Sequence, residues 1–291
     1  MARDHDHKNE SLENDLKTLT QQLLSRRRAM IWLAAGASAL PLAIACGSDT
    51  SQNAATPSAD ADTTASTGTD STTGTDTTTN TTCSIIPEET AGPYPGDGSN
   101  GVNALVLSGI VRKNIKPSIG TSSKVAEGVP LSIEITLLNA NGNCVELEGY
   151  AVYLWHCDRA GLYSMYSTAV KNENYLRGVQ EADASGKLTF ESIFPGCYDG
   201  RWPHIHFEVY KSLAAATSSK NKIATSQIAL PAAQCKLAYA ASGYSSSVTN
   251  LSKASLANDN VFSDGSSLQL PVIEGNATTG FTIRLVVGVK G

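Results

Sequence analysis

The sequence predicts an all-β fold, an antiparallel β-sandwich with long loops, over residues 83–291. Short β-branched or alternating runs recur throughout this region, as expected for strands of a layered sheet protein. The segments between them contain good turn residues, in 140-ANGN-143, 158-DRAG-161 and 183-DASG-186. No amphipathic helical pattern extends beyond two turns. Together these observations favour two sheets packed face to face.

The expected strands are recognised by alternating or β-branched residues bounded by turn residues. They are 104-ALVLSGIV-111, 129-VPLSIEITLLN-139, 149-GYAVYLWH-156, 187-KLTFESIF-194, 204-HIHFEVY-210, 223-IATSQIAL-230 and 281-FTIRLVVGV-289.

The first 46 residues are typical of an export signal. A polar stretch ends in 25-SRRR-28 and is followed by an apolar run of 17 residues, 29-AMIWLAAGASALPLAIA-45. A basic start, a short apolar run and small residues before a cleavage point predict secretion. The paired arginines resemble a twin-arginine signal, and Cys46 resembles the lipid-bearing cysteine of a lipoprotein. At this length an uncleaved membrane anchor is the alternative.

Residues 47–82 consist almost entirely of Ser, Thr, Asp, Ala, Gly and Asn. Such a segment has too little apolar surface to offset its ordering entropy, so a disordered linker is expected. Placed after Cys46, it would hold the folded domain away from a membrane surface. The alternative is a linker without an anchoring role.

The composition argues against a nucleic-acid partner. The 291 residues carry a net charge of -5 and are 41% hydrophobic, which is typical of a soluble globular protein. No stripe of Lys and Arg lies beyond the first thirty residues, as a nucleic-acid surface would need.

The six cysteines predict disulfides, because the chain is expected to be exported. If Cys46 is lipidated, the pairing among the other five stays open, and at least one is unpaired. Those five are Cys83, Cys144, Cys157, Cys197 and Cys235. One expectation is that a bond between Cys197 and Cys235 braces the loop before the histidine strand.

The strand at 204–210 begins with two histidines at spacing two. Residues i and i+2 of a strand point to one face, so His204 and His206 project together while Ile205 and Phe207 face the opposite layer. Two imidazoles on a rigid strand suit a metal ion. Taken alone, the pair is a weak signal, because two such histidines can also be a structural pair or an accident of the surface.

Two tyrosines lie in loops that would complete such a site. Tyr198 belongs to the loop 195-PGCYDGRWP-203, which also carries Arg201, and Tyr163 follows the turn at 158–161. Two phenolate oxygens with two imidazoles favour a hard trivalent cation, Fe(III), over Zn or Cu. The alternative is that these tyrosines are amphipathic edge residues, as most of the ten tyrosines must be.

Several motifs occur in an order that resembles a known family. They are 88-EETAGPYPGDG-98, 154-LWHCDRAGLYS-164, 176-LRGVQEADASGKLTFESIFPGCY-198, 201-RWPHIH-206 and 225-TSQI-228. Residues 83–291 resemble the intradiol ring-cleavage dioxygenases of the catechol and protocatechuate type, specifically the compact, secreted, single-domain kind.

The resemblance implies a non-haem Fe(III) cofactor and a set of site residues. The metal ligands would be Tyr163, Tyr198, His204 and His206. The family's displaceable tyrosine matches Tyr198, which would also take part in catalysis, as would Arg201 and Gln227.

The sequence also departs from the family pattern. Cys197 replaces a bulkier residue, and the strand after Gln227 lacks the usual aromatic. The helical dimerisation segment of the cytoplasmic enzymes is missing, so the oligomeric state stays open.

The implied reaction is cleavage of a catechol-type diol by O2, between its two hydroxyl-bearing carbons, to a cis,cis-muconate-type diacid. The partners would be a small aromatic diol and O2, together with a membrane if Cys46 is lipidated. Which catechol is used stays open, although Arg177 is a candidate to recognise a ring carboxylate.

Two other functions are compatible with the same residues. One is a tethered β-sandwich that binds a ligand without chemistry. The other is a different mononuclear metalloenzyme, in which Glu208 joins His204 and His206 as a ligand, since all three share one face of a regular strand.

Overall fold

The computed structural model describes residues 83–291. The export signal expected over 1–46 and the linker expected over 47–82 lie outside the described residues, and both stay predictions. Within the described range no helix is long and apolar enough to span a membrane.

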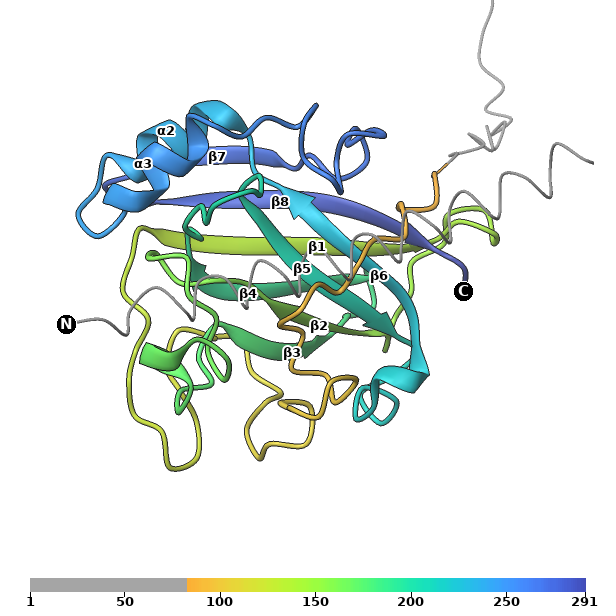
Figure 1. Cartoon of the computed structure of the whole chain (residues 1–291). Coiled ribbons are helices and arrows are strands. Elements are labelled where there is room, and N and C mark those ends of the chain that lie inside the picture. Colours follow the sequence, from red (N-terminus) through yellow and green to blue (C-terminus); the bar gives the residue numbers. More distant parts are fainter. Residues whose placement is uncertain (1–82) are drawn as a thin grey trace, which may run out of the picture. The chain divides into compact units, whose positions relative to one another are not determined.

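Two four-stranded sheets form the domain (Figure 1). The first has the order β4-β1-β8-β7 and the second the order β3-β2-β5-β6. The strands are β1 Pro130–Asn139, β2 Ala151–Trp155, β3 Arg177–Glu181, β4 Lys187–Ile193, β5 His204–Tyr210, β6 Lys222–Ala229, β7 Val272–Asn276 and β8 Gly280–Val289. The predicted β-sandwich is therefore confirmed.

Within residues 83–291, helical structure is confined to short segments. Two α-helices, α2 Ala232–Tyr239 and α3 Ser245–Leu251, follow β6 and lie beside β7 (Figure 1). Two 3-10 turns, η1 Thr168–Val170 and η2 Ser219–Asn221, occur in connecting loops.

The core lies between the sheets and follows the alternation of the strands. Ile133 of β1 and Ile283 of β8 point inward from the first sheet, and Leu154 of β2 and Phe207 of β5 do so from the second; all four are fully buried. Burying such side chains stabilises the fold by about 1.5–3 kcal/mol each. Because Phe207 is directed inward, its strand neighbours in the sequence are directed to the outer face.

The outer face of the second sheet is also buried, because loops cover it. Tyr153 and Trp155 of β2 and Tyr210 of β5 pack there under residues from the loop before β1 and the loop after β2. This second, aromatic cluster is where a polar site can be enclosed without interrupting the main core.

Three details differ from the sequence expectation. β1 and β8 pair in parallel, so the sandwich is not wholly antiparallel. Residues 104–111 form turns, and only Val111 makes an isolated bridge, to Val179. β3 and β7 are additional strands; β7 is mostly exposed, which removes the alternating pattern that would have revealed it.

One disulfide joins Cys83 to Cys144, whereas Cys157, Cys197 and Cys235 are free and buried. The expected bond between Cys197 and Cys235 is therefore wrong. The thiol of Cys197 instead contacts the carbonyl of Arg201, at 3.5 Å.

Candidate metal centre

The two histidines of β5 lie on the covered outer face of the second sheet, as their spacing predicts. His204 and His206 are each 2% exposed, and Ile205 between them is in the main core. The neighbouring strands add two more side chains to the same face. Trp155 of β2 and Gln227 of β6 both pair with His206 in register, and the Trp155 indole stacks on the His206 ring with centroids 4.9 Å apart.

A backbone carbonyl sets the orientation of the His204 imidazole. Its Nδ1 lies 2.5 Å from the carbonyl oxygen of Trp202. Because a carbonyl can only accept, Nδ1 carries the proton and the Nε2 lone pair is directed into the site. An N–H donated in this way to a carbonyl is the usual arrangement for a metal-binding histidine.

Burial keeps both imidazoles neutral. Desolvation lowers the pKa of His204 and of His206 well below the ordinary value, and the nearby Arg201 cation lowers both further. A neutral imidazole is the form that binds a metal ion.

The two tyrosines reach His204 from separate loops. The phenol oxygen of Tyr163, from the loop after β2, lies 3.5 Å from His204 Nε2, and that of Tyr198, from the loop before β5, lies 3.2 Å from the same atom. Tyr163 is fully enclosed, whereas Tyr198 is only half-buried.

Glycines allow these groups to approach one another. Gly161 has a φ of +82°, and a Cβ there would lie 3.1 Å from the Cβ of Tyr198. Gly92 covers the other side, where a Cβ would lie 3.3 Å from Cε1 of His206. Both positions therefore need a residue without a side chain.

The donor set fits a cation better than it fits a hydrogen-bond network. His204 Nε2 is approached by both phenols and, at 3.1 Å, by His206 Nε2. Its single lone pair cannot accept from three groups, whereas a central cation could receive one lone pair from each. Ligand atoms bonded at about 2 Å to one ion lie roughly 3 Å apart, which matches these separations.

The electrostatics of Tyr163 lead to the same conclusion. Burial first, and then the neighbouring Tyr198, raise the pKa of Tyr163 well above its ordinary value. Such a phenol becomes a phenolate only beside a strong positive charge. Residues 83–291 contain no group of three His, Cys, Asp or Glu side chains placed to hold a metal.

Arg201 lies beside the four ligand candidates and is held at two of its nitrogens. Its Nε donates to Asp259 at 2.9 Å and its Nη2 donates to Gln227 at 2.7 Å. Gln227 in turn donates to the carbonyl of Thr90. Burial disfavours the charge of Arg201, but Tyr198 and Asp259 outweigh this effect and raise its pKa, so it is a permanent cation.

Sequence reasoning did not identify Asp259. It lies in the irregular segment between α3 and β7, 58 residues after Arg201, and no periodic pattern or motif singles it out. Two backbone amides that follow it bind its carboxylate, which resembles many ordinary turns.

Glu208 does not join the histidines. Its carboxylate accepts from Lys222 Nζ and from the Tyr210 hydroxyl, each at 2.7 Å, and burial raises its pKa to about 7. Because these partners turn it away from His206, the ligand set of two histidines and one carboxylate is not assembled.

Arg177 is also committed elsewhere. It is 1% exposed, and its guanidinium donates to the carbonyls of Tyr94, Pro95 and Ser164 and to the hydroxyls of Tyr153 and Ser164. Its role is to hold the covering loops, so it is not available to recognise a ring carboxylate.

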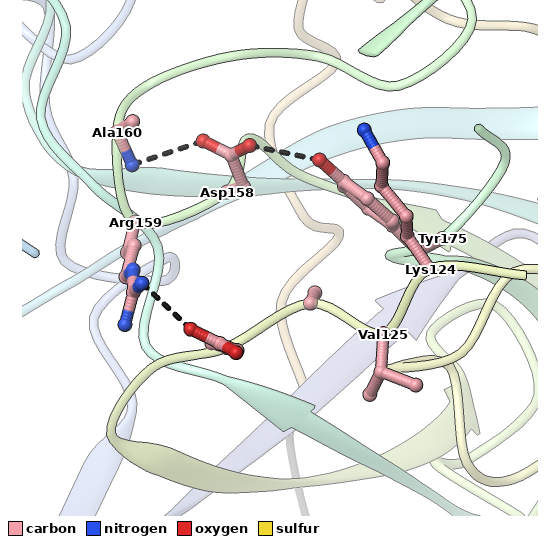
Figure 2. A pocket seen from close by; sticks show the side chains of 8 residues that line it. Lys124, Val125, Asp158, Arg159, Ala160 and Tyr175 are labelled. Atoms are coloured by element: carbon pink, nitrogen blue, oxygen red, sulfur yellow. Dashed lines mark hydrogen bonds and ion pairs between the residues drawn. The ribbon is translucent and has the colours of Figure 1, made fainter. Parts of the chain in front are cut away.

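A separate surface pocket of about 440 Å³ is lined by residues 124–127, residues 158–160 and Tyr175 (Figure 2). In it Tyr175 donates to Asp158, and Arg159 forms an exposed ion pair with Glu127. These pairs stabilise the turn that carries Gly161 and leads to Tyr163.

Comparison with known proteins supports the fold. Residues 116–220 match the family model described as Dioxygenase, a range that includes Tyr163, Tyr198, Arg201, His204 and His206. No curated protein matches the chain.

Solved structures give the same result for the fold. An intradiol ring-cleavage dioxygenase from Tetranychus urticae is similar at 24% identity and a TM-score of 0.53, covering 71% of this chain and 95% of its own. A second dioxygenase structure is similar at 23% identity and a TM-score of 0.55, covering 71% and 94%. The resemblance to intradiol ring-cleavage dioxygenases is thereby confirmed, together with the β-sandwich.

Proposed function

We propose that this protein is a non-haem Fe(III)-dependent intradiol dioxygenase, which uses O2 to cleave a catechol-type diol to a cis,cis-muconate-type dicarboxylic acid. The observation that carries the proposal is the convergence of two phenol oxygens and two imidazole nitrogens around one point. His204 Nε2 lies within 3.5 Å of the donor atoms of Tyr163, Tyr198 and His206.

Tyr163, Tyr198, His204 and His206 would hold the ferric ion. Anionic oxygen donors favour the trivalent state. The bound ion would act as a Lewis acid that binds both oxygens of the diol and activates the ring toward O2.

Tyr198 is the ligand suited to leave and to take a proton from the diol. It is half-buried, and it comes from a loop rather than from a strand. Tyr163 and the histidines, which are enclosed, would stay in place. A phenolate that is released beside an incoming hydroxyl is a base within reach of the proton it must accept.

Arg201 and Gln227 would act on the reacting ring. The guanidinium is a permanent cation fixed next to the ligand strand, so it can stabilise negative charge that develops on the substrate during cleavage. Gln227 is opposite His206 in register and would orient the intermediate.

One observation bears on which substituents the ring of the substrate carries. Arg177 makes its hydrogen bonds to covering loops, so this residue does not favour a protocatechuate-type substrate over a simple catechol.

We further propose that the enzyme is exported and attached to a membrane through a lipid on Cys46. Incorporation of labelled palmitate into the full chain, but not into Cys46→Ala, is the expected outcome; equal labelling would contradict it.

The visible spectrum of the iron-loaded full chain tests the function. A tyrosinate-to-Fe(III) charge-transfer band is expected, which shifts when catechol is added under argon, and admission of O2 should then produce the diacid. The double variant Tyr163→Phe/Tyr198→Phe should lose the band, whereas Tyr150→Phe should keep it. A colourless iron-loaded protein, or a band that survives the double variant, would refute the ligand assignment.

A further inference from the structure

Asp259 is a buried carboxylate with an unusually complete set of partners. Its side chain is fully enclosed, and it lies in an irregular segment that contains none of the metal ligand candidates. A buried carboxylate needs hydrogen bonds that replace those it would make to water. Asp259 accepts four hydrogen bonds, two at each oxygen.

One oxygen of Asp259 is fixed by its own turn, and the other faces the site. Oδ1 accepts from the amides of Val261 and Phe262, at 2.9 and 3.2 Å. Oδ2 accepts from Arg201 Nε at 2.9 Å and from the amide of Trp202 at 2.6 Å. Because the turn orients the carboxylate, Asp259 can hold both the backbone and the side chain at the start of the histidine strand.

The second anchor of Arg201 uses a different nitrogen of the guanidinium. Nη2 donates to Gln227, and the ring of Phe262 lies 6.0 Å from the guanidinium carbon. Neither anchor uses Nη1. A planar group held at Nε and Nη2 has no remaining rotation, so the direction of Nη1 is fixed before a substrate arrives.

We propose that Asp259 is a positioning residue for ring cleavage, which fixes the Arg201 guanidinium in the orientation that stabilises charge on the reacting ring. This inference rests on the proposed function. The requirement is for a carboxylate, because an amide that keeps its oxygen on the Val261 and Phe262 amides would direct its NH2 group at two other donors.

A kinetic cycle with catechol on the iron-loaded full chain tests the coupling. Asp259→Asn should lower kcat about 10–100-fold, the scale expected when a charge-stabilising group is misplaced, and should change KM by less than about threefold. In an Arg201→Gln background the same change should cost less than about twofold, since no guanidinium is left to position. A full loss in both backgrounds, or an unchanged kcat, would overturn the proposal.

Glu134→Gln is a matched control. Glu134 accepts from Arg284 Nε at the same 2.9 Å, but this ion pair is exposed and on the other sheet. Its loss should leave kcat unchanged. Asp259→Glu retains a carboxylate and should recover part of the kcat that Asp259→Asn loses; an equal loss in a folded Asp259→Glu variant would argue against positioning through charge.

A readout independent of turnover separates this inference from the proposed function. In the NMR spectrum of the full chain, the Nε–H of Arg201, identified by its absence in Arg201→Gln, should exchange slowly with solvent. In Asp259→Asn it should exchange at least about tenfold faster. If the wild type cleaves no catechol but this difference is seen, the proposed reaction fails and Asp259 still positions Arg201; rapid exchange in the wild type would refute the positioning.

Discussion

At the scale of single residues, the role of a buried histidine depends on the partners of its two ring nitrogens. His156 is fully buried, with Nδ1 bound to the carbonyl of Cys157 and Nε2 bound to the hydroxyl of Ser192. His204 has one nitrogen on a carbonyl and the other facing phenols. A histidine with both nitrogens satisfied is structural, whereas one with a free lone pair is available to a metal.

The buried His156 should make stability depend on pH. Burial lowers its pKa from 6.5 to about 4. Between these values the unfolded chain binds the proton and the folded chain does not, so the free energy of unfolding falls as the pH falls from 6.5 to 4, by about 3 kcal/mol in total. Urea denaturation across this range should show that the free energy of unfolding depends less steeply on pH in His156→Gln than in the wild type. The difference should correspond to the uptake of one proton. Parallel curves for the wild type and the variant would contradict the assignment.

Loops at the element scale bring the site together. The sheet supplies His204, His206 and Gln227 in fixed register, but the two phenols come from the loop after β2 and the loop before β5. The turn at Asp158–Gly161 contacts the Tyr198 loop directly, since Gly196 lies against the carbonyls of Asp158 and Arg159. The distance between the two tyrosines therefore depends on glycines.

Gly161→Ala should disturb the site more than an equivalent change elsewhere. Gly161 and Gly149 both have a positive φ, of +82° and +76°, but a Cβ at Gly149 meets nothing within 4 Å. Each substitution should cost about 1–2 kcal/mol of backbone strain. Only Gly161→Ala should also move Tyr198, so the charge-transfer band should weaken or shift in that variant alone. Iron titration of both variants measures the band, and urea denaturation measures the loss of stability. Identical spectra of the two variants would show that the added methyl group at position 161 does not move Tyr198.

The disulfide at the whole-molecule scale ties the start of the domain to a distant loop. Cys83 precedes the covering loops, and Cys144 lies between β1 and β2, 61 residues away. The same N-terminal segment bridges β8 through Ile85 and Gly288. It then continues to Gly92, which lies against His206, so the disulfide stabilises the cover of the site.

Removal of the disulfide should lower stability without removing the ligands. Closure of a loop of this length is worth about 4 kcal/mol by chain entropy. Cys83→Ser/Cys144→Ser should lose up to this amount in urea denaturation, and a reductant should destabilise the wild type but not the variant. Equal effects of the reductant on both proteins would contradict the pairing.

Much of the fold and of the candidate site could be predicted from residue patterns. The alternation in 204-HIHFEVY-210 determined that both histidines share a face, and the turn residues marked where chains reverse. Residues 104–111 do not form the predicted strand, because a short apolar run in a loop that packs onto a sheet has the same composition as a strand.

The sequence by itself determined the β-sandwich and, through motif order, the resemblance to ring-cleavage dioxygenases, and it predicted the types of ligand that we propose for the metal. Only the tertiary structure decided which distant residues complete the site. Asp259 accepts a hydrogen bond from Arg201, and Glu208 accepts one from Lys222. Arg177 donates its hydrogen bonds to loop carbonyls. A local sequence pattern determines the face of the sheet on which a side chain lies, because strand geometry is periodic. Which residue that side chain contacts depends on how the loops, which have no periodic pattern, fold over the sheet.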